Sequence, residues 1–361
     1  MKVLAVSGSS GGHIFPAISF LEALSDKKEG IETLLVLPER SKKIQVLTSC
    51  RIKYIATSVL RPSFELKNLA ALFQIGKSFF QSLFILIEFQ PQVVIGFGTI
   101  DSIPILFFAW LFRINTIIHE QNVALGKANK VLSKIVDKVA VSFAASKDCL
   151  KDNQRIVFTG NPIRRQLEKV DKFKALNSFG FLNNKFTILV MGGSQGSHRI
   201  NEAFIDALGT LKDKDRLQII HLTGSKDFEF AKKRYKDLNI VAKVFDFFES
   251  MENAYCASDL AICRAGATTV TELMYFRLPA IFIPYPHAYG HQLTNALELE
   301  KKGCSLILEE ENLNNGRLKE AIELLLASPQ KINDMRQAYD SLSVGNAALL
   351  LADEVVSLVK S

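Results

Sequence analysis

The stretch VLAVSGSSGGHIFPAISFL, residues 3–21, decides the fold. It opens with the short apolar run Val3–Val6, which is followed by the loop Gly8–His13, rich in glycine and serine. Apolar residues then recur at helical spacing, at Ile14, Ala17, Ile18 and Leu21. A strand, a glycine-rich turn and a helix in this order predict the start of a parallel sheet covered by helices.

The same alternation of apolar runs and helix-like segments continues along the chain. In the first half the further runs are Thr33–Leu37, Val93–Ile95, Thr116–Ile118, Lys138–Val141 and Ile156–Phe158. The second half repeats the pattern with Phe186–Met191, Leu217–Leu222, Lys243–Phe245, Leu260–Cys263, Ala280–Ile283 and Ser305–Leu308. Two such series in 361 residues predict two doubly wound, Rossmann-like α/β domains.

The break between the two series falls near GNPIR, Gly160–Arg164, where a turn follows an apolar run. We therefore expect domains at 1–162 and 163–344. Ligands of such sheets bind beyond the carboxyl ends of the strands, so the cleft between the two domains is the expected site.

Composition narrows the class of protein. The five cysteines form no CxxC pair or zinc-binding spacing, which predicts free thiols in a reducing compartment. No signal peptide is evident at the amino terminus. The most apolar stretches, Phe79–Phe89 and Ile103–Phe112, fall short of the roughly 20 residues of a membrane-spanning helix, so none is expected.

Positive charge is concentrated in the first half. Residues 1–160 hold 19 Lys or Arg and 12 Asp or Glu, whereas residues 161–361 hold 25 of each, so the whole net charge of +7 lies in the first half. That half also holds the most apolar stretches. The pattern fits a domain that rests on an anionic membrane, or simply a basic surface over buried helices.

Glycine-rich turns are the first candidate binding elements. The loop Gly8–His13 and the loop Gly192–Gly196 each join an apolar run to a helix, and Cys263–Leu273 forms a third such junction. Glycines let backbone amides approach a phosphate at a helix start. None of the three matches a dinucleotide or P-loop fingerprint, and tight packing of helix on strand also requires glycine.

Two polar segments extend the candidate site. His119–Asn122, HEQN, places four hydrogen-bonding side chains at the end of an apolar run. Pro284–Asn295, PYPHAYGHQLTN, follows another run, and Gln292 and Asn295 lie within it. Both segments suit a sugar with several hydroxyls, although the second also fits an ordinary proline-rich loop.

Taken together, these stretches resemble the MurG family of UDP-N-acetylglucosamine transferases. The matching segments occur in family order over residues 8–296: Gly8–Ala17, His119–Asn122, Gly160–Arg164, Gly192–Gly196, Arg264–Leu273 and His291–Ala296. The resemblance implies the two-domain GT-B fold. Residues 1–162 would take the lipid acceptor and the membrane, with a last helix at about 345–361 packing back onto them, and residues 163–344 would bind UDP-GlcNAc.

The resemblance also implies the reaction. GlcNAc would pass from UDP-GlcNAc to the 4-hydroxyl of undecaprenyl-pyrophosphoryl-muramyl-pentapeptide, with inversion and without metal or cofactor. The enzyme would lie peripherally on the cytoplasmic face of the plasma membrane, on anionic lipid, with no nucleic-acid partner. Asp213-Lys214-Asp215 has the DxD form of metal-dependent transferases, but its charged surroundings predict a solvated loop.

The catalytic candidates are His13 and Glu120. An unperturbed histidine is largely neutral near pH 7, so His13 suits the general base that removes the acceptor proton. A structural reading, in which His13 only hydrogen-bonds its own loop, stays open. Glu120 is a second base, an orienting partner or a buried structural carboxylate. His198, His221 and His287 are interpreted as surface or packing residues.

The substrate-binding residues follow from matching the family's motifs. In the first domain and at its boundary they are Ser10, Gly11, Gly12, Asn122 and Arg164. In the second they are Ser194, Phe248, Ala267, Thr268, Thr269, Val270, Thr271, Glu272 and Gln292. Among these, Glu272 would hold the ribose, Phe248 would lie at the uracil, and Arg164 would stabilise the leaving diphosphate.

Some positions depart from the family. Ser10 replaces a threonine, and His291 precedes Gln292 where a glutamine pair is usual. In Gly96–Pro104, Thr99 and Ile100 stand in place of a glycine and a tyrosine. Two alternatives therefore stay open: a GT-B transferase that uses another lipid such as diacylglycerol, and a nucleotide-sugar epimerase or inactive binding protein.

Overall fold

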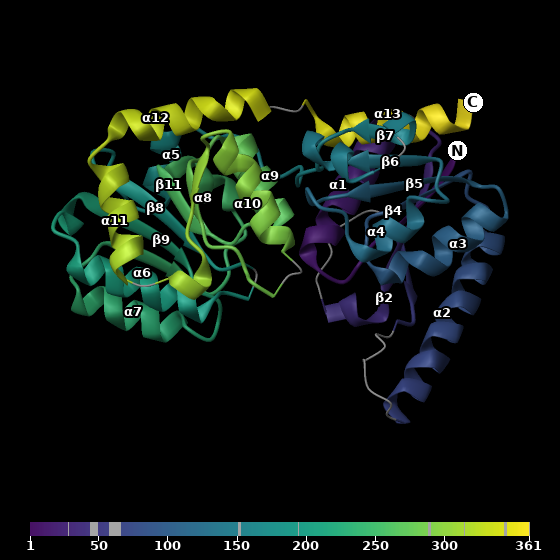
Figure 1. Ribbon diagram of the computed structural model, residues 1–361, viewed down its shortest axis with the longest axis horizontal. Helices are drawn as coiled ribbons and strands as arrows, with labels where there is room; N and C mark the ends of the chain where they lie inside the picture. The colour runs from purple at the N-terminus through teal and green to yellow at the C-terminus, as the bar shows by residue number, and fades with distance from the viewer. Residues whose placement is uncertain are drawn as a thin grey trace. The chain divides into compact units, whose positions relative to one another are not determined.

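The computed structural model describes residues 1–27, 29–43, 50–57, 66–150, 153–193, 195–287, 290–313, 315–342 and 345–360. The chain divides into two compact units (Figure 1). Unit 1 comprises Met1–Arg164 with Val344–Ser361, and unit 2 comprises Arg165–Ser343.

Unit 1 is built on a parallel sheet in the order β3-β2-β1-β4-β5-β6-β7. Its strands are β1 (Lys2–Val6), β2 (Glu32–Pro38), β3 (Arg51–Ile55), β4 (Val93–Gly96), β5 (Asn115–Glu120), β6 (Lys138–Val141) and β7 (Ile156–Phe158). Because β1 pairs with β2 on one side and with β4 on the other, the strand order reverses beside β1. A ligand crevice is expected at the carboxyl ends of strands at such a reversal.

Helices cover both faces of this sheet. They are α1 (Gly11–Lys27), α2 (Leu66–Phe89), α3 (Ile103–Leu111), α4 (Lys127–Leu132) and α13 (Ala347–Lys360). Side chains alternate along β1, so Val3 and Ala5 join the core beneath α1 and α13, whereas Leu4 and Val6 join the core beneath α2 and α3. The last helix, α13, therefore belongs to unit 1, where Leu351 and Val355 are fully buried.

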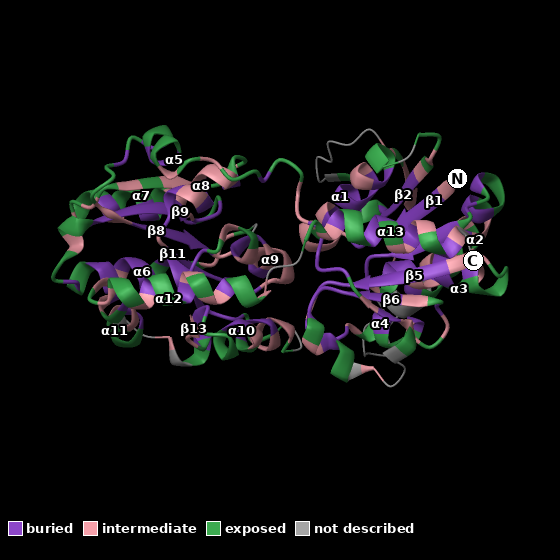
Figure 2. Ribbon diagram, turned by 90° about the horizontal axis from the view of Figure 1, so that it is seen from above, coloured by how far each residue is buried: buried purple, intermediate pink, exposed green. Residues whose placement is uncertain are grey.

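Unit 2 repeats this architecture with the strand order β10-β9-β8-β11-β12-β13. Its strands are β8 (Phe186–Met191), β9 (Leu217–Leu222), β10 (Ala242–Phe245), β11 (Leu260–Cys263), β12 (Ala280–Phe282) and β13 (Ser305–Ile307). Its helices are α5 (Lys172–Ser178), α6 (His198–Thr210), α7 (Phe228–Asp237), α8 (Met251–Ala257), α9 (Ala267–Phe276), α10 (His291–Lys301), α11 (Asn315–Leu326) and α12 (Pro329–Ala338). Figure 2 shows the buried strands within each unit.

The predicted fold class, two doubly wound α/β units, is confirmed. One strand was missed: β3 lies at the edge of the unit 1 sheet, and its sequence RIKYI carries charge and stays partly exposed. An edge strand needs no continuous apolar run, because only one neighbour covers its backbone groups.

One helix is longer than the apolar stretches of the sequence suggested. Helix α2 has 24 residues, and its part Ala71–Phe89 is long and apolar enough by length and composition. A second stretch that passes the same test, Pro329–Val359, comprises the separate helices α12 and α13. In α2, Ser82, Ile85 and Leu86 are buried within unit 1, so the helix has an inner and an outer face.

Candidate active site

The loop after β1 lies against the loop after β4. A Cβ added at Gly8 would lie 2.4 Å from Cγ2 of Thr99, so glycine permits this close approach. Helix α1 then starts at Gly11, and the amide of His13 donates to the Ser10 carbonyl at 3.0 Å. Ser10, Gly11 and Gly12 thus form the first turn beside the sheet reversal.

His13 points toward the end of β5. Its Nδ1 lies 3.1 Å from Oε1 of Gln121. Burial lowers the pKa of His13 below its usual value, while the Glu120 charge and the hydrogen bond to Gln121 partly oppose that shift. The ring is therefore neutral near pH 7, the form that a general base requires.

Each carboxylate oxygen of Glu120 accepts two hydrogen bonds. Its Oε1 accepts from the backbone amide of Asn122 at 3.0 Å and from the Asn122 side chain at 3.2 Å. Its Oε2 accepts from the Gly126 amide at 2.9 Å and from Nδ2 of Asn129 at 2.8 Å. Four donors on a buried carboxylate favour the structural interpretation, in which Glu120 shapes the loop that carries Asn122 and places negative charge near His13.

Arg40 and Asp101 add a charged pair that sequence reasoning missed. Nη2 of Arg40 lies 2.5 Å from Oδ2 of Asp101, and its Nε donates to the Ser9 hydroxyl at 2.9 Å. Burial raises the pKa of Asp101, whereas the Arg40 charge lowers it. Arg40 follows the carboxyl end of β2, and Asp101 follows that of β4. Because ligands bind at the carboxyl ends of such strands, this position in the sequence could have identified both residues as candidates.

Arg164 stacks within unit 1. Its guanidinium carbon lies 5.2 Å from the centre of the Phe15 ring on α1. A cation held over an aromatic face is oriented but keeps its charge, so Arg164 can still meet an anion.

In unit 2 the loops after β8 and β9 interlock. Gly196 has φ 74°, and a Cβ there would lie 1.9 Å from the Thr223 carbonyl oxygen. Gly224 has φ 76° and approaches Gln195 in the same way. Glycine is required at both positions because the two loops contact each other through their backbones. This agrees with the alternative that the glycines serve tight packing, and the loop after β8 still carries its backbone amides. The predicted Ser194 lies outside the described residues.

Helix α9 carries the predicted phosphate and ribose residues. Thr268 and Thr269 are half-buried in its first turn after Ala267, and Glu272 is 5% exposed. Oε2 of Glu272 accepts from the Tyr255 hydroxyl at 2.6 Å. Tyr255, on α8, was missed because its partner is distant in sequence.

The side chains of Val270 and Thr271, also on α9, are engaged within unit 2 itself. The Val270 side chain is fully buried in the core, so only its backbone can meet a ligand. The Thr271 hydroxyl donates to the Ala267 carbonyl at 2.8 Å, within the helix.

Arg264 ties together the strand ends of unit 2. It forms a buried ion pair with Glu310. It also donates to the Ile283 carbonyl at 3.0 Å and to the Ser197 hydroxyl at 2.9 Å. Arg264 thereby fixes loops after β8, β12 and β13, a role that its place in the motif Arg264–Leu273 did not predict.

The remaining predicted residues follow the carboxyl ends of two other strands of unit 2, Gln292 after β12 and Phe248 after β10. Oε1 of Gln292, on α10, accepts from the Tyr285 amide at 2.9 Å and so holds the proline-rich loop. The Phe248 ring packs on Phe245 and Phe179, with centroids 4.5 and 5.5 Å away.

Neither unit has a metal cluster in the part that the structure describes: no group of three or more His, Cys, Asp or Glu residues is close enough to hold an ion. Asp213 and Asp215 are exposed and precede β9, at the amino end of the strand and away from the glycine loops.

Comparison with known proteins identifies the family. The glycosyltransferase family 28 N-terminal domain matches residues 3–141, and the family 28 C-terminal domain matches residues 187–350. The UDP-N-acetylglucosamine--N-acetylmuramyl-(pentapeptide) pyrophosphoryl-undecaprenol N-acetylglucosamine transferase of Geobacter metallireducens is 35% identical over 99% of this chain and 98% of its own. The enzyme of the same name from Thermoanaerobacter sp. is 35% identical over 100% of both chains. The chain belongs to this transferase family.

Solved structures agree with that assignment to the MurG family. Acinetobacter baumannii MurG has a TM-score of 0.78 and 27% identity, and the match covers 99% of this chain and 100% of that chain. UDP-GlcNAc 2-epimerase from Neisseria meningitidis has a TM-score of 0.69 and 16% identity over 100% of both chains. At that identity the likeness shows the shared fold alone.

At Thr99, where the resemblance predicted a glycine, the backbone takes an unusual conformation. Thr99 has φ 73° and ψ 156°, a region that glycine adopts and other residues avoid. The next residue, Ile100, is exposed where the family's tyrosine was expected.

Proposed function

We propose that this chain transfers GlcNAc from UDP-GlcNAc to the 4-hydroxyl of undecaprenyl-pyrophosphoryl-muramyl-pentapeptide. The observation that carries the proposal is the 35% identity over almost the full length of relatives that bear this name. The neutral His13 at the sheet reversal of unit 1 and the Glu272 site of unit 2 support it.

In the proposed mechanism, the acceptor hydroxyl oxygen forms the new bond to the anomeric carbon while the bond to the UDP oxygen breaks, with inversion. Nε2 of His13 takes the hydroxyl proton. Negative charge then grows on the diphosphate, where the amides of the Gly192–Gly196 loop, the first turn of α9 and Arg164 would stabilise it. No metal or cofactor takes part in this scheme.

Donor binding falls to unit 2 in this proposal. Thr268 and Thr269 would contact phosphate, and Glu272 would accept from the ribose hydroxyls. Gln292 would contact the sugar, and Phe248 would lie at the uracil. Asn122 of unit 1 would contact GlcNAc hydroxyls.

The test is transfer of radiolabelled GlcNAc to a synthetic muramyl-pentapeptide pyrophosphoryl lipid, with and without EDTA. Labelled disaccharide lipid supports the proposal, and the His13→Ala variant should reduce its formation with little change in UDP binding. Transfer only to diacylglycerol would favour the other transferase class. Conversion of UDP-GlcNAc without an acceptor would favour the epimerase alternative.

We further propose that unit 1 rests on the anionic cytoplasmic face of the plasma membrane. The outer face of α2 carries Phe73, Phe80, Phe84 and Ile87, and the first three are 73%, 65% and 57% exposed. Trp110, Leu111 and Phe112, at the end of α3, are exposed as well, and α3 packs on α2. We call these seven residues the α2–α3 apolar surface.

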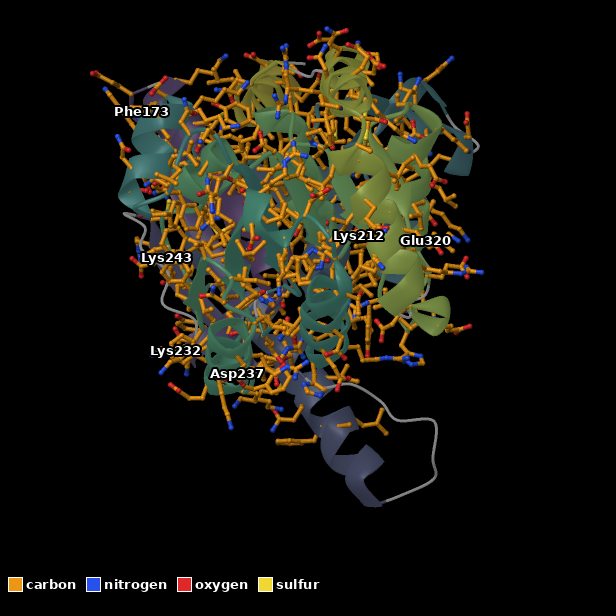
Figure 3. All side chains as sticks on the ribbon, turned by 90° about the vertical axis from the view of Figure 1, so that its left-hand side faces the viewer. Phe173, Lys212, Lys232, Asp237, Lys243 and Glu320 are labelled. Atoms are coloured by element: carbon orange, nitrogen blue, oxygen red, sulfur yellow. The ribbon has the colours of Figure 1, made fainter. Side chains whose placement is uncertain are left out.

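Positive charge beside the α2–α3 apolar surface favours a lipid bilayer as its binding partner. Lys77 lies on the same face of α2, and Arg113 follows α3. Aromatic rings with flanking basic residues suit the boundary between lipid headgroups and acyl chains. Unit 2, by contrast, exposes mixed charges such as Lys212, Lys232, Asp237 and Glu320 (Figure 3).

A further inference from the structure

Behind His13, two buried side chains form a chain of hydrogen bonds to the backbone. Nε2 of His119 lies 2.9 Å from the Gly160 carbonyl oxygen. A carbonyl only accepts, so Nε2 of His119 carries the proton. Burial lowers the pKa of His119 to about 4, so its ring is neutral and its Nδ1 is an acceptor.

Gln121 can then adopt only one amide orientation. Its Nε2 lies 3.3 Å from Nδ1 of His119 and 3.3 Å from the Phe97 carbonyl oxygen. Both of these atoms are acceptors, so the amide nitrogen must face them. The amide oxygen is left facing Nδ1 of His13 at 3.1 Å.

We propose that Gln121 and His119 are positioning residues that hold His13 in the tautomer with the proton on Nδ1 and the basic lone pair on Nε2. This inference rests on the proposed function only where it makes Nε2 the base. Two backbone carbonyls, of Gly160 and Phe97, set the direction of every hydrogen bond in the chain. Gln121 is 1% exposed and His119 fully buried, so water does not compete with these bonds.

The arrangement has a chemical consequence. A neutral imidazole can accept a proton at only one ring nitrogen, and the partner of the other nitrogen decides which one. The Phe97 backbone also forms a hydrogen bond with His13. Without Gln121, Nδ1 of His13 loses its side-chain acceptor, and the ring can exchange between its two tautomers, of which only one presents Nε2 as a base. The wrong tautomer of a catalytic histidine costs large factors in turnover.

The tautomer itself is measurable in the free, full-length protein. Long-range nitrogen–proton spectra of ¹⁵N-histidine-labelled protein distinguish the two nitrogens of each of the six histidines. We expect His13 to be protonated on Nδ1 at pH 7.5, and Gln121→Leu to convert it to a mixture. His119→Phe should give a smaller change, because the Phe97 carbonyl still orients Gln121. Protonation of His13 on Nε2 in the native protein, or an unchanged spectrum in Gln121→Leu, would overturn the proposal.

Kinetics supply the second readout. Gln121→Leu should lower kcat by roughly tenfold to a hundredfold with little change in the KM for UDP-GlcNAc. Thr116→Val is the matched control, because it removes another buried hydrogen bond of β5, the 2.8 Å contact with Asp137. That control should keep both the native tautomer and the native kcat, whereas an equal loss in both variants would reduce Gln121 to a structural role.

The pH profile separates positioning from folding. His13 must be neutral, so kcat falls as the pH drops through its pKa. The charges of Glu120 and Asp101 raise that pKa, and so does the hydrogen bond to Gln121, which Gln121→Leu removes. We expect the acid limb of Gln121→Leu to move to lower pH, and an unmoved limb would contradict the proposal. Absence of transfer by the native protein would instead overturn the proposed function, while the spectra still decide the tautomer.

Discussion

At the scale of single residues, the backbone of Thr99 has a conformation that is unusual for threonine. Its φ of 73° and ψ of 156° belong to the region that only glycine adopts at no cost, and a glycine is what the motif of the family leads one to expect there. The sequence shows the threonine, and only the structure shows that it takes a conformation that favours glycine.

We predict that Thr99→Gly stabilises unit 1. Relief of backbone strain contributes about 1–3 kcal/mol, and the greater freedom of glycine in the unfolded chain takes back about 0.5–1 kcal/mol. The net gain in the free energy of unfolding should be about 1 kcal/mol, measured by urea denaturation. Thr294→Gly, inside helix α10, should destabilise instead, and a loss in both variants would show that Thr99 is not strained.

We predict that Glu272→Gln weakens donor binding. A hydrogen bond to a charged group contributes about 1.5–3 kcal/mol, so the KM for UDP-GlcNAc should rise by about tenfold or more. Tyr255→Phe is the matched control, since it removes the 2.6 Å hydrogen bond to Glu272 and keeps the carboxylate. Steady-state kinetics should show a smaller effect for that control, and an equal rise would assign Glu272 to packing against α8.

At the scale of elements, α2 shows how one helix serves two environments. Buried and exposed positions alternate with helical period, so Ser82, Ile85 and Leu86 face the core while Phe73, Phe80 and Phe84 face outward. Both faces are apolar, and for that reason the amino-acid pattern alone left open whether the segment is simply buried. The exposed fractions decide that question.

We predict that Phe80→Ser with Phe84→Ser weakens binding to anionic vesicles without loss of stability. Each of these rings is exposed in the free protein, so its removal opens no cavity, whereas each contributes on the order of 1 kcal/mol of apolar burial in lipid. Sedimentation with vesicles measures the effect. Phe173→Ser, an exposed phenylalanine of unit 2 (Figure 3), should bind as the native protein does. Equal binding of the double variant would exclude the α2–α3 apolar surface as the contact.

At the scale of the whole molecule, each unit holds a fully buried histidine that is neutral, His119 in unit 1 and His221 in unit 2. Burial lowers the pKa of His119 in unit 1 to about 4 and that of His221 in unit 2 to about 3. Both rings pack among hydrogen-bond partners that suit the uncharged form. Each unit therefore carries its own sensitivity to acid.

We predict that both units lose stability as the pH falls below about 6.5. The folded pKa of each histidine lies below its unfolded value, so the unfolded chain binds more protons between the two values. Stability is intact above the unfolded pKa, and it falls by about 1.4 kcal/mol per pH unit and histidine down toward the folded pKa. Urea denaturation at pH 7.5 and 5.5 measures this, and His221→Gln should show a shallower slope. A slope that does not change would place the acid sensitivity elsewhere.

We predict that salt weakens binding to anionic vesicles. The whole net charge of +7 belongs to residues 1–160, and exposed charges are screened beyond about 10 Å at 0.1 M salt. Binding should therefore fall between low and high ionic strength, and neutral vesicles should bind less at every salt concentration. Equal binding to neutral vesicles would remove the electrostatic part of the proposal.

The sequence by itself determined the two doubly wound sheets, because periodicity and glycine turns are local properties of the chain. It also pointed to His13, Glu272 and the family, since these lie in short motifs. The edge strand β3 and the outer face of α2 were decided only by tertiary structure, as their patterns fit more than one environment. The same holds for the four donors on Glu120, the Arg40–Asp101 pair and the path from His13 through Gln121 to His119. The donors on Glu120 come from the segment that follows β5, whereas the other partners come from different strands and loops, which the strand order β2-β1-β4-β5 brings to one edge of the sheet.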